Sequence, residues 1–408
     1  MRVIVVGGGA AGFFAAISVR EHHPETEVLL LEKTDKLLAK VRISGGGRCN
    51  VTHHEPNIRK LAAHYPRGGQ FLRKVFNRFG VPDTIAWYAR RGVALKVEAD
   101  GRMFPVSDDS ATIIRCLVEE AGKVGVRVLC RSGVSGLSVD GSGRFMLRLD
   151  GGDMLEADRV IITTGGHPKA EGYAWLKVLG IGLVAPVPSL FTFNMPGEPV
   201  RALMGLVAAD VRARIAGTGL ESRGPLLITH WGMSGPAILR LSAWGARTVR
   251  DMGYCFTLQL NWLGEAGEEA VRTALADPAI TRKQARNANP FGLPHRLWEF
   301  LLAKADIPVE RTWGEVAKKD RNRLVDLLTN DRYAVSGKTT FKEEFVTAGG
   351  VALEEVDPHT MQCRTVPGLY FAGEVLDIDG ITGGFNFQAA WSTGWLAGRL
   401  GQSAGTAT

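Results

Sequence analysis

The sequence predicts an α/β protein in which a Rossmann-like domain is interrupted by an inserted β-barrel-like lobe and a small helical lobe. Two observations carry this prediction. A strand, a glycine-rich turn and a helix open the chain, and a similar pattern returns near its end. Between them lie short strand-like segments, followed by a stretch rich in helix formers. We expect three parts, residues 1–187 with 345–408, residues 188–263 with 331–344, and residues 264–330.

Length and composition agree with a large folded chain. The 408 residues are 45% hydrophobic, which is enough to build a core without disulfides or a structural metal. The five cysteines are scattered and odd in number, with no CxxC or CxxxxC pair. This pattern argues against a zinc ribbon, a disulfide framework and a redox-active dithiol, so we expect no metal site and a reducing, cytoplasmic setting.

The net charge and the N-terminal residues indicate which kinds of partner to expect. A formal charge of +7 over 408 residues is a mild bias that favours anionic ligands. No clustered basic and aromatic stripe stands out, so we expect a small-molecule substrate rather than nucleic acid. Residues 3–19 carry no charged side chain, but their glycines would weaken a membrane helix, and we expect no membrane span.

The first motif is GxGxxG. The strand Arg2–Val6 leads into Gly7, which makes the tight turn, Gly9, which lets a pyrophosphate approach, and Gly12, which allows close helix packing. Ala10 and Ala11 begin a helix to about His22 whose amides would face the phosphates. The second strand, 28–31, ends on Glu32, a carboxylate suited to a ribose hydroxyl and unsuited to a 2′-phosphate. These residues predict a site for FAD or NAD rather than NADP, and do not choose between the first two.

A basic, glycine-rich loop follows Glu32. It contains Lys33, Arg42 and Arg48 around the triple glycine Gly45-Gly46-Gly47. Three adjacent glycines are costly to order, so we expect their backbone to approach a diphosphate or a ring closely. A solvated loop is the alternative.

Further elements complete the first domain. We expect a helix over 108–124, strands over 126–130 and 159–163, and a small antiparallel meander over 138–158. In the insertion we expect strands at 190–194, 206–215, 225–229 and 255–261, and helices at 296–304 and 320–328. At the C-terminus, the strand Gly368–Phe371 runs into Gly373 and Glu374, and a glycine-rich turn at 379–386 leads into a helix over about 387–400. The start of that helix would stabilise negative charge on an electron-accepting ring.

Taken together, these motifs resemble the bacterial YhiN/BaiN-type flavoproteins, a family of NAD(P)/FAD-dependent oxidoreductases. The resemblance spans nearly the whole chain, and its most specific parts are SGGGRCN (44–50) and GEVLDIDGITGGFNFQ (373–388). It implies non-covalently bound FAD in the two-dinucleotide-binding-domain fold. It also places the pyrophosphate at Gly7, Gly9 and Gly12, the ribose at Glu32, and the flavin-side loop at Arg42, Gly46 and Arg48. By the same resemblance Gly165 lies near the adenosine or diphosphate, Gly373 and Glu374 near the ribityl chain, and Gly384, Phe385 and Asn386 beside the isoalloxazine.

A bound flavin carries hydride transfer itself, so the protein needs to supply positioning and one proton. Asn386 beside the ring and the polar, aromatic pair His230 and Trp231 are our catalytic candidates; a structural role for His230 is the alternative. Cys49 has no partner at a suitable spacing and is expected to be structural. Only one complete GxGxxG occurs, so NADH or NADPH would bind transiently as reductant, or the substrate would reduce the flavin and oxygen reoxidise it. We therefore predict an FAD-dependent oxidoreductase of a small molecule. A flavin-dependent RNA-modification protein and a non-catalytic flavin-binding protein are the alternatives.

Overall fold

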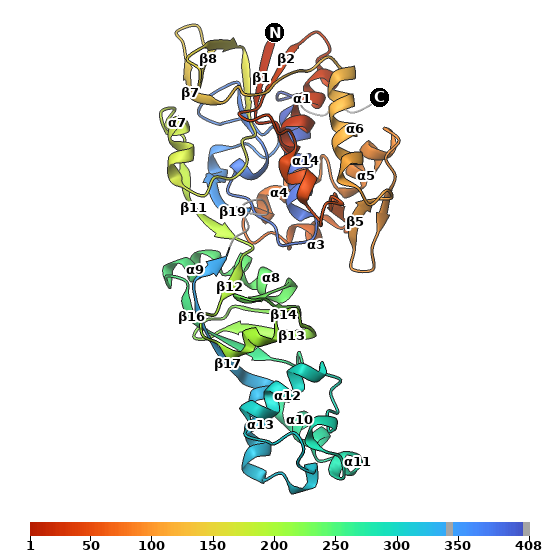
Figure 1. Ribbon diagram of the computed structural model, residues 1–408. Coiled ribbons are helices and arrows are strands. Elements are labelled where there is room, and N and C mark those ends of the chain that lie inside the picture. The colour runs from red at the N-terminus through yellow and green to blue at the C-terminus, as the bar shows by residue number, and fades with distance from the viewer. Residues whose placement is uncertain (340–345, 403–408) are drawn as a thin grey trace. The chain divides into compact units, whose positions relative to one another are not determined.

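A computed structural model describes residues 1–339 and 346–402 (Figure 1). Its internal contacts divide the chain into unit 1, Met1–Ser189 with Lys342–Thr408, and unit 2, Leu190–Phe341. Unit 2 is thus an insertion in unit 1. The predicted boundary at 344/345 lies outside the described residues, and the finer division into a β lobe and a helical lobe stays a prediction.

Unit 1 is built on a five-stranded sheet of order β20-β10-β1-β2-β6 whose strands are all parallel. The strands are β1 (Arg2–Val6), β2 (Glu27–Leu31), β6 (Arg127–Leu129), β10 (Arg159–Ile162) and β20 (Leu369–Phe371). The apolar runs of β1, β2, β10 and β20 are buried, as expected of central parallel strands, whereas the edge strand β6 is only partly buried. The carboxyl ends of β1, β2, β10 and β20 therefore meet at one edge, where the predicted cofactor residues lie.

The remaining elements of unit 1 flank this sheet. The helices are α1 (Ala10–His22), α2 (Ala39–Ile43), α3 (Ile58–Ala62), α4 (Gly69–Phe76), α5 (Val81–Ala89), α6 (Ser110–Lys123), α7 (Ala174–Lys177) and α14 (Phe385–Ala397). Two small sheets contain β3 (Thr52–His53), β4 (Leu95–Val97), β5 (Arg102–Pro105), and the meander β7 (Val134–Val139), β8 (Phe145–Leu149), β9 (Met154–Ala157). The C-terminal helix starts two residues earlier than predicted, because Gly384 at φ +92° ends the preceding turn.

Helices α1 and α14 lie side by side in the interior of unit 1 (Figure 1). Small residues allow this contact: a Cβ on Gly394 would lie 2.5 Å from the Ala11 carbonyl oxygen, and one on Gly398 would lie 2.5 Å from that of Ala15. Ser18 also donates from Oγ to the Trp395 carbonyl at 2.7 Å. The two ends of the sequence thereby form one folded body.

Both connections to the insertion pass through one strand pair. β11 (Leu183–Ser189) leads into unit 2, and β19 (Val346–Val351) follows the return to unit 1. The two strands are antiparallel, and Ser189 lies directly opposite Val346. The insertion therefore leaves and re-enters unit 1 at neighbouring positions.

Unit 2 contains a seven-stranded sheet of order β17-β16-β13-β14-β15-β12-β18. The strands are β12 (Thr192–Asn194), β13 (Val207–Ile215), β14 (Glu221–Ile228), β15 (Gly232–Ser234), β16 (Cys255–Asn261), β17 (Asp331–Ser336) and β18 (Lys338–Thr339). Only Gly337, at φ +100°, separates the first strand of this order from the last, so the sheet closes on itself at a bend. Its helices are α8 (Pro236–Trp244), α9 (Ala246–Asp251), α10 (Glu268–Leu275), α11 (Pro278–Thr281), α12 (His295–Lys304) and α13 (Lys318–Asn330).

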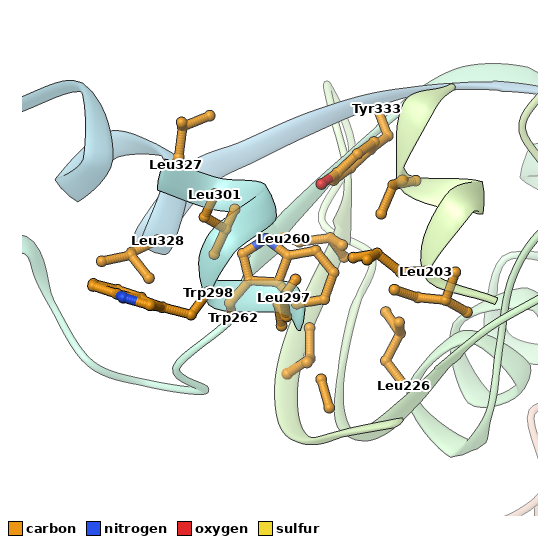
Figure 2. Packing of buried hydrophobic residues seen from close by; sticks show 14 of the residues in the cluster. Leu203, Leu226, Leu260, Trp262, Leu297, Trp298, Leu301, Leu327, Leu328 and Tyr333 are labelled. Atoms are coloured by element: carbon orange, nitrogen blue, oxygen red, sulfur yellow. The ribbon is translucent and has the colours of Figure 1, made fainter. Parts of the chain in front are cut away.

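The strands and helices of unit 2 share one apolar cluster. Leu260 and Trp262 from the sheet side pack with Leu297, Trp298 and Leu301 of α12 (Figure 2). Buried Asp331 accepts hydrogen bonds from the Trp262 Nε1 at 3.1 Å and from the Tyr333 hydroxyl, and it pairs with Lys304. Within the described ranges of both units, no helix combines the length and apolarity needed to cross a bilayer.

Candidate functional site

The glycine-rich turn after β1 is fixed by close packing. Gly7, at φ +117°, donates its amide to the Leu31 carbonyl at 2.7 Å, and its own carbonyl accepts from the Thr163 hydroxyl at 3.0 Å. A Cβ on Gly7 would lie 2.4 Å from the Thr163 oxygen, and one on Gly12 would lie 1.9 Å from the Gly7 oxygen. These two glycines are required by the fold of the turn itself.

Three other predicted glycines face open space. A Cβ added to Gly9, Gly46 or Gly165 would meet no atom within 4 Å. Gly46 and Gly165 also adopt positive φ, at +71° and +74°. The backbone at these three positions is thus open to an approaching ligand, as it also is at other surface glycines, and at Gly46 and Gly165 the positive φ by itself favours glycine.

Glu32 lies beside this turn at the end of β2. Its Oε2 accepts from the Gly8 amide at 2.9 Å, and its Oε1 accepts from the amide and the hydroxyl of Thr34, each at 2.9 Å. The carboxylate is therefore held in a fixed orientation while remaining half-buried. Lys33, next to it, is exposed.

A second set of contacts joins the loop after Glu32 to the C-terminal motif. The Leu38 amide donates to the Gly8 carbonyl at 2.9 Å, and the Lys40 ammonium pairs with Glu374 Oε2 at 2.7 Å. Glu374 Oε1 accepts from the Thr347 amide at 2.9 Å, and a Cβ on Gly373 would lie 2.8 Å from that of Ala11. The structure thus brings together the predicted residues of the turn, the loop and the returning strand.

Arg42 and Arg48 differ in their surroundings. Arg42 is exposed, and its carbonyl accepts from Ser110 Oγ at 2.8 Å. The Arg48 guanidinium pairs with Glu98 at 2.6 Å and Asp108 at 3.4 Å, and its central carbon lies 4.0 Å from the Phe104 ring centroid. Arg48 is therefore already neutralised by two carboxylates, and a structural role for it is well supported.

The start of α14 is fastened to the triple-glycine loop. With its amide oriented to satisfy both neighbours, Asn50 donates to the Thr52 carbonyl at 3.0 Å and accepts from the Gly384 amide at 3.0 Å. A Cβ on Gly384 would lie 2.5 Å from the Thr52 carbonyl carbon. Asn386 donates to the Gly380 carbonyl at 2.9 Å and accepts from its amide at 2.8 Å. Asn386 thus closes the turn at 380–386 with both ends of its amide, which makes it a positioning residue for that turn.

The sequence reasoning missed the surroundings of Phe385. Its ring is buried and stacks on His53, with centroids 4.6 Å apart, and on His64, with centroids 4.4 Å apart. The Tyr65 hydroxyl donates to the Phe385 carbonyl at 2.6 Å. The phenyl group therefore anchors α14 to the segment around residues 53–65 and is not exposed to a ligand.

A buried ion pair, also missed, supports the same turn. The side chain of Asp379 is fully buried, pairs with Arg67 and accepts from Ser189 Oγ at 2.6 Å. Burial raises the pKa of Asp379, while the hydrogen bond from Arg67 opposes this effect. Asp379 belongs to the DGITGG motif, but its partner lies more than 300 residues earlier, so no local pattern identifies the pair.

The other candidates lie elsewhere. His230 is exposed and Trp231 half-buried in the turn between β14 and β15 of unit 2, with ring centroids 3.7 Å apart.

Cys49 is buried, and burial raises the pKa of its thiol to about 12. Its thiol is thus protonated near neutral pH, which supports a structural role. No group of three or more His, Cys, Asp or Glu side chains able to hold a metal was found in residues 1–339 and 346–402.

The fold and the turn at the carboxyl edge define the class: a Rossmann-type enzyme with the architecture of FAD-dependent oxidoreductases. Residues 1–400 match the HI0933-like protein Rossmann domain, and the chain belongs to that family. The expected family, fold and enzyme class are thereby confirmed.

Two curated relatives span almost the full length. The chain is 29% identical to a 3-dehydro-bile acid delta(4,6)-reductase of Clostridium scindens, over 98% of each chain. It is 32% identical to a ribosomal RNA dihydrouridine synthase of Escherichia coli, over 96% of each chain. Among solved structures, a 3-ketosteroid delta1-dehydrogenase from Sterolibacterium denitrificans shares the fold with a TM-score of 0.50 at 13% identity, over 97% of this chain and 98% of that one.

Proposed function

We propose that this chain binds FAD non-covalently and reduces a carbon–carbon double bond conjugated to a carbonyl group. The open side of Gly9, Gly46 and Gly165, beside the fixed carboxylate of Glu32, is the observation that carries FAD binding. A dinucleotide would use the amides of the turn and of α1 for its pyrophosphate and Glu32 for its ribose. The buried Thr347 hydroxyl, which has no hydrogen-bond partner among the described residues and lies beside Gly166, adds a polar group suited to the same ligand.

The reaction class is supported by what the two relatives have in common. One is named for reducing a 3-oxo bile acid with ring double bonds, the other for converting uridine to dihydrouridine. In both cases a ring double bond is conjugated to a carbonyl, so its far carbon accepts hydride and its near carbon then takes a proton. Reduced FAD would supply the hydride.

The chain's own residues would orient the ring and the proton. With Gly384 fixed by Asn50 and Thr52, the first amides of α14 would stabilise negative charge on a bound ring system. His230 and Trp231 remain our candidates for the proton donor and the substrate wall. NADH or NADPH would bind transiently as reductant.

Anaerobic spectroscopy tests the proposal. Protein reconstituted with FAD is mixed with NADH or NADPH, and the absorbance of the oxidised flavin is expected to fall. Addition of a 3-oxo-4-ene steroid, a 3-oxo bile acid or a uridine-containing ribosomal RNA fragment is then expected to restore it, with the saturated product found by mass spectrometry. Protein that takes up no FAD would refute the cofactor assignment. Reduced flavin that is reoxidised by a quinone but by none of the conjugated compounds would refute the reaction class.

A small conjugated ketone and a uracil base in RNA are the two substrate candidates. The distribution of basic side chains described next bears on the choice between them.

A further inference from the structure

One segment of unit 1 carries positive charge without any carboxylate. Between Glu55 and Asp83 the chain has six Lys or Arg residues and no Asp or Glu. The overall charge of +7 hides this segment, because basic and acidic residues are nearly balanced over the whole chain. Arg67, one of the six, forms the buried ion pair with Asp379 and is not available to a ligand.

The other five cations are exposed; four lie on two helices that contact each other, α3 and α4, and the fifth follows the end of α4. They are Arg59, Lys60, Arg73, Lys74 and Arg78. Helix α4 buries Leu72, Val75 and Phe76 on its inner face, which leaves its basic residues on the outer one. With Arg399 we call these residues the basic strip.

The segment that carries the basic strip contacts α14 near both ends of that helix. Near the start of α14, Tyr65 bonds to Phe385, and near its end the Phe79 ring stacks on Trp395 with centroids 5.0 Å apart. Helix α4 contacts α14, and α3 packs on α4. From Phe385 to Arg399 the rise of a helix amounts to about 20 Å. One end of the strip therefore adjoins the turn we assign to the flavin ring, and the strip is much longer than a single phosphate.

A small pocket marks the other end. It has a volume of about 100 Å³ and is lined by Arg78, Arg399, His359, Thr360, Gln402 and Trp395 among others, with no carboxylate in its lining. Two guanidinium groups thus share one pocket without a counter-charge. Burial lowers the pKa of Arg399, and the charge of Arg78 adds to this effect. An anion in the pocket would relieve the repulsion.

We propose that the basic strip binds the phosphodiester backbone of RNA, with one phosphate in the pocket between Arg78 and Arg399. Accessible cations on neighbouring elements, with no carboxylate in the same segment, are the features that neutralise a polyanion. The inference deepens the proposed function by naming the substrate class, and it rests on that function only in choosing RNA among polyanions.

Fluorescence anisotropy with the full-length, FAD-loaded protein tests the strip. The probe is a labelled, uridine-containing RNA hairpin, titrated from 50 to 200 mM salt. We expect Lys74→Gln/Arg78→Gln to weaken binding roughly tenfold and to make the logarithmic salt dependence shallower by about 2. The control, Lys123→Gln/Arg127→Gln, removes the same charge from exposed positions on α6 and β6 and should leave binding unchanged.

Further measurements distinguish RNA from other anions and test the basic strip independently of the proposed function. Equal losses in both double variants, or no RNA binding at 50 mM salt, would overturn the inference. So would phosphatidylglycerol vesicles bound more tightly than RNA, or NADPH binding that depends on Arg78 while RNA binding does not. Flavin reduction by NADH or NADPH, and its reoxidation by a small conjugated ketone, are measured on the same preparations. If RNA binding fails while this chemistry persists, only the strip is refuted.

Discussion

At the scale of single residues, the glycines of the candidate site fall into two groups according to their surroundings. Gly7, Gly12 and Gly384 are packed against backbone atoms, whereas Gly9, Gly46 and Gly165 face open space. A sequence motif cannot make this distinction, because all six are the same letter. The distance to the nearest atom separates glycines that are packed against the protein from those whose backbone is open, although positive φ also favours glycine at Gly46 and Gly165.

Substitution by alanine should have different effects in the two groups of glycines. Gly12→Ala places a methyl group 1.9 Å from the Gly7 oxygen and is expected to lower the melting temperature of the FAD-free protein and abolish FAD binding. Gly9→Ala, at a backbone φ of −94°, should keep that melting temperature and weaken FAD binding at least tenfold. Thermal denaturation and flavin fluorescence titration measure the two effects. Normal FAD affinity in Gly9→Ala would show that the pyrophosphate does not approach there.

Because its thiol is buried, Cys49 should make the protein less stable as the pH becomes alkaline. The thiol pKa is about 12 in the folded protein against an ordinary 9.0, because the group is buried. Between these values the unfolded chain loses a proton that the folded chain keeps, so the free energy of unfolding falls as pH rises, by up to about 1.4 kcal/mol per pH unit. Urea denaturation at pH 8, 9 and 10 should show this loss relative to Cys49→Ala, which lacks the thiol. A difference between the two proteins that stays constant with pH would contradict the assignment.

At the scale of elements, the contact between α1 and α14 depends on the absence of side chains. Gly394→Ala directs a methyl group to within 2.5 Å of the Ala11 oxygen, and we expect a loss of about 1–3 kcal/mol in the free energy of unfolding. Gly122→Ala in α6, where a Cβ meets nothing within 4 Å, is the matched control and should be neutral or stabilising by up to about 1 kcal/mol. Denaturant unfolding measures both. Equal changes in the free energy of unfolding would mean that helix propensity, and not packing between α1 and α14, determines the effect of Gly394→Ala.

The pair of Arg67 and Asp379 joins the 65–68 segment to the turn before α14. Arg67→Met would leave a carboxylate buried without its cation and should destabilise unit 1 by about 3–5 kcal/mol. Because burial raises the pKa of Asp379, this loss should shrink when the carboxyl group is protonated at acidic pH. The double variant Arg67→Met/Asp379→Asn should recover part of the stability at pH 7. A double variant no more stable than the single one would place the cost in lost packing rather than in charge.

At the scale of the whole molecule, local patterns predicted local structure well. The ranges expected for β1, α1 and β16 agree with the structure, since apolar runs and turn glycines specify them within a few residues. Pairings between distant segments were not predictable: the stacking of Phe385 on His53 and His64, and the partner of Asp379, depend on chain ends that meet only after folding. The placement of Phe385 beside the flavin came from family resemblance and stays a prediction; the structure shows that its ring is buried.

Because Ser189 and Val346 are paired, residues 190–345 should be removable. We expect a variant in which a short Gly-Ser linker replaces them to fold, to unfold cooperatively and to bind FAD as the full chain does. Turnover of the conjugated substrate should be lost, since His230 and Trp231 are gone. Circular dichroism and flavin titration are the measurements. A linker variant that does not bind FAD would show that the cofactor site needs unit 2.

The paired strands β11 and β19 also bear on how such enzymes diversify. A segment with adjacent entry and exit points can be replaced by one of different length or shape without rethreading its host. Recombination at these two junctions would exchange unit 2 and keep unit 1, which carries the predicted cofactor residues. Chimaeras of this chain with the bile-acid and ribosomal-RNA relatives, cut at the same junctions, offer a direct route to transplanting substrate preference.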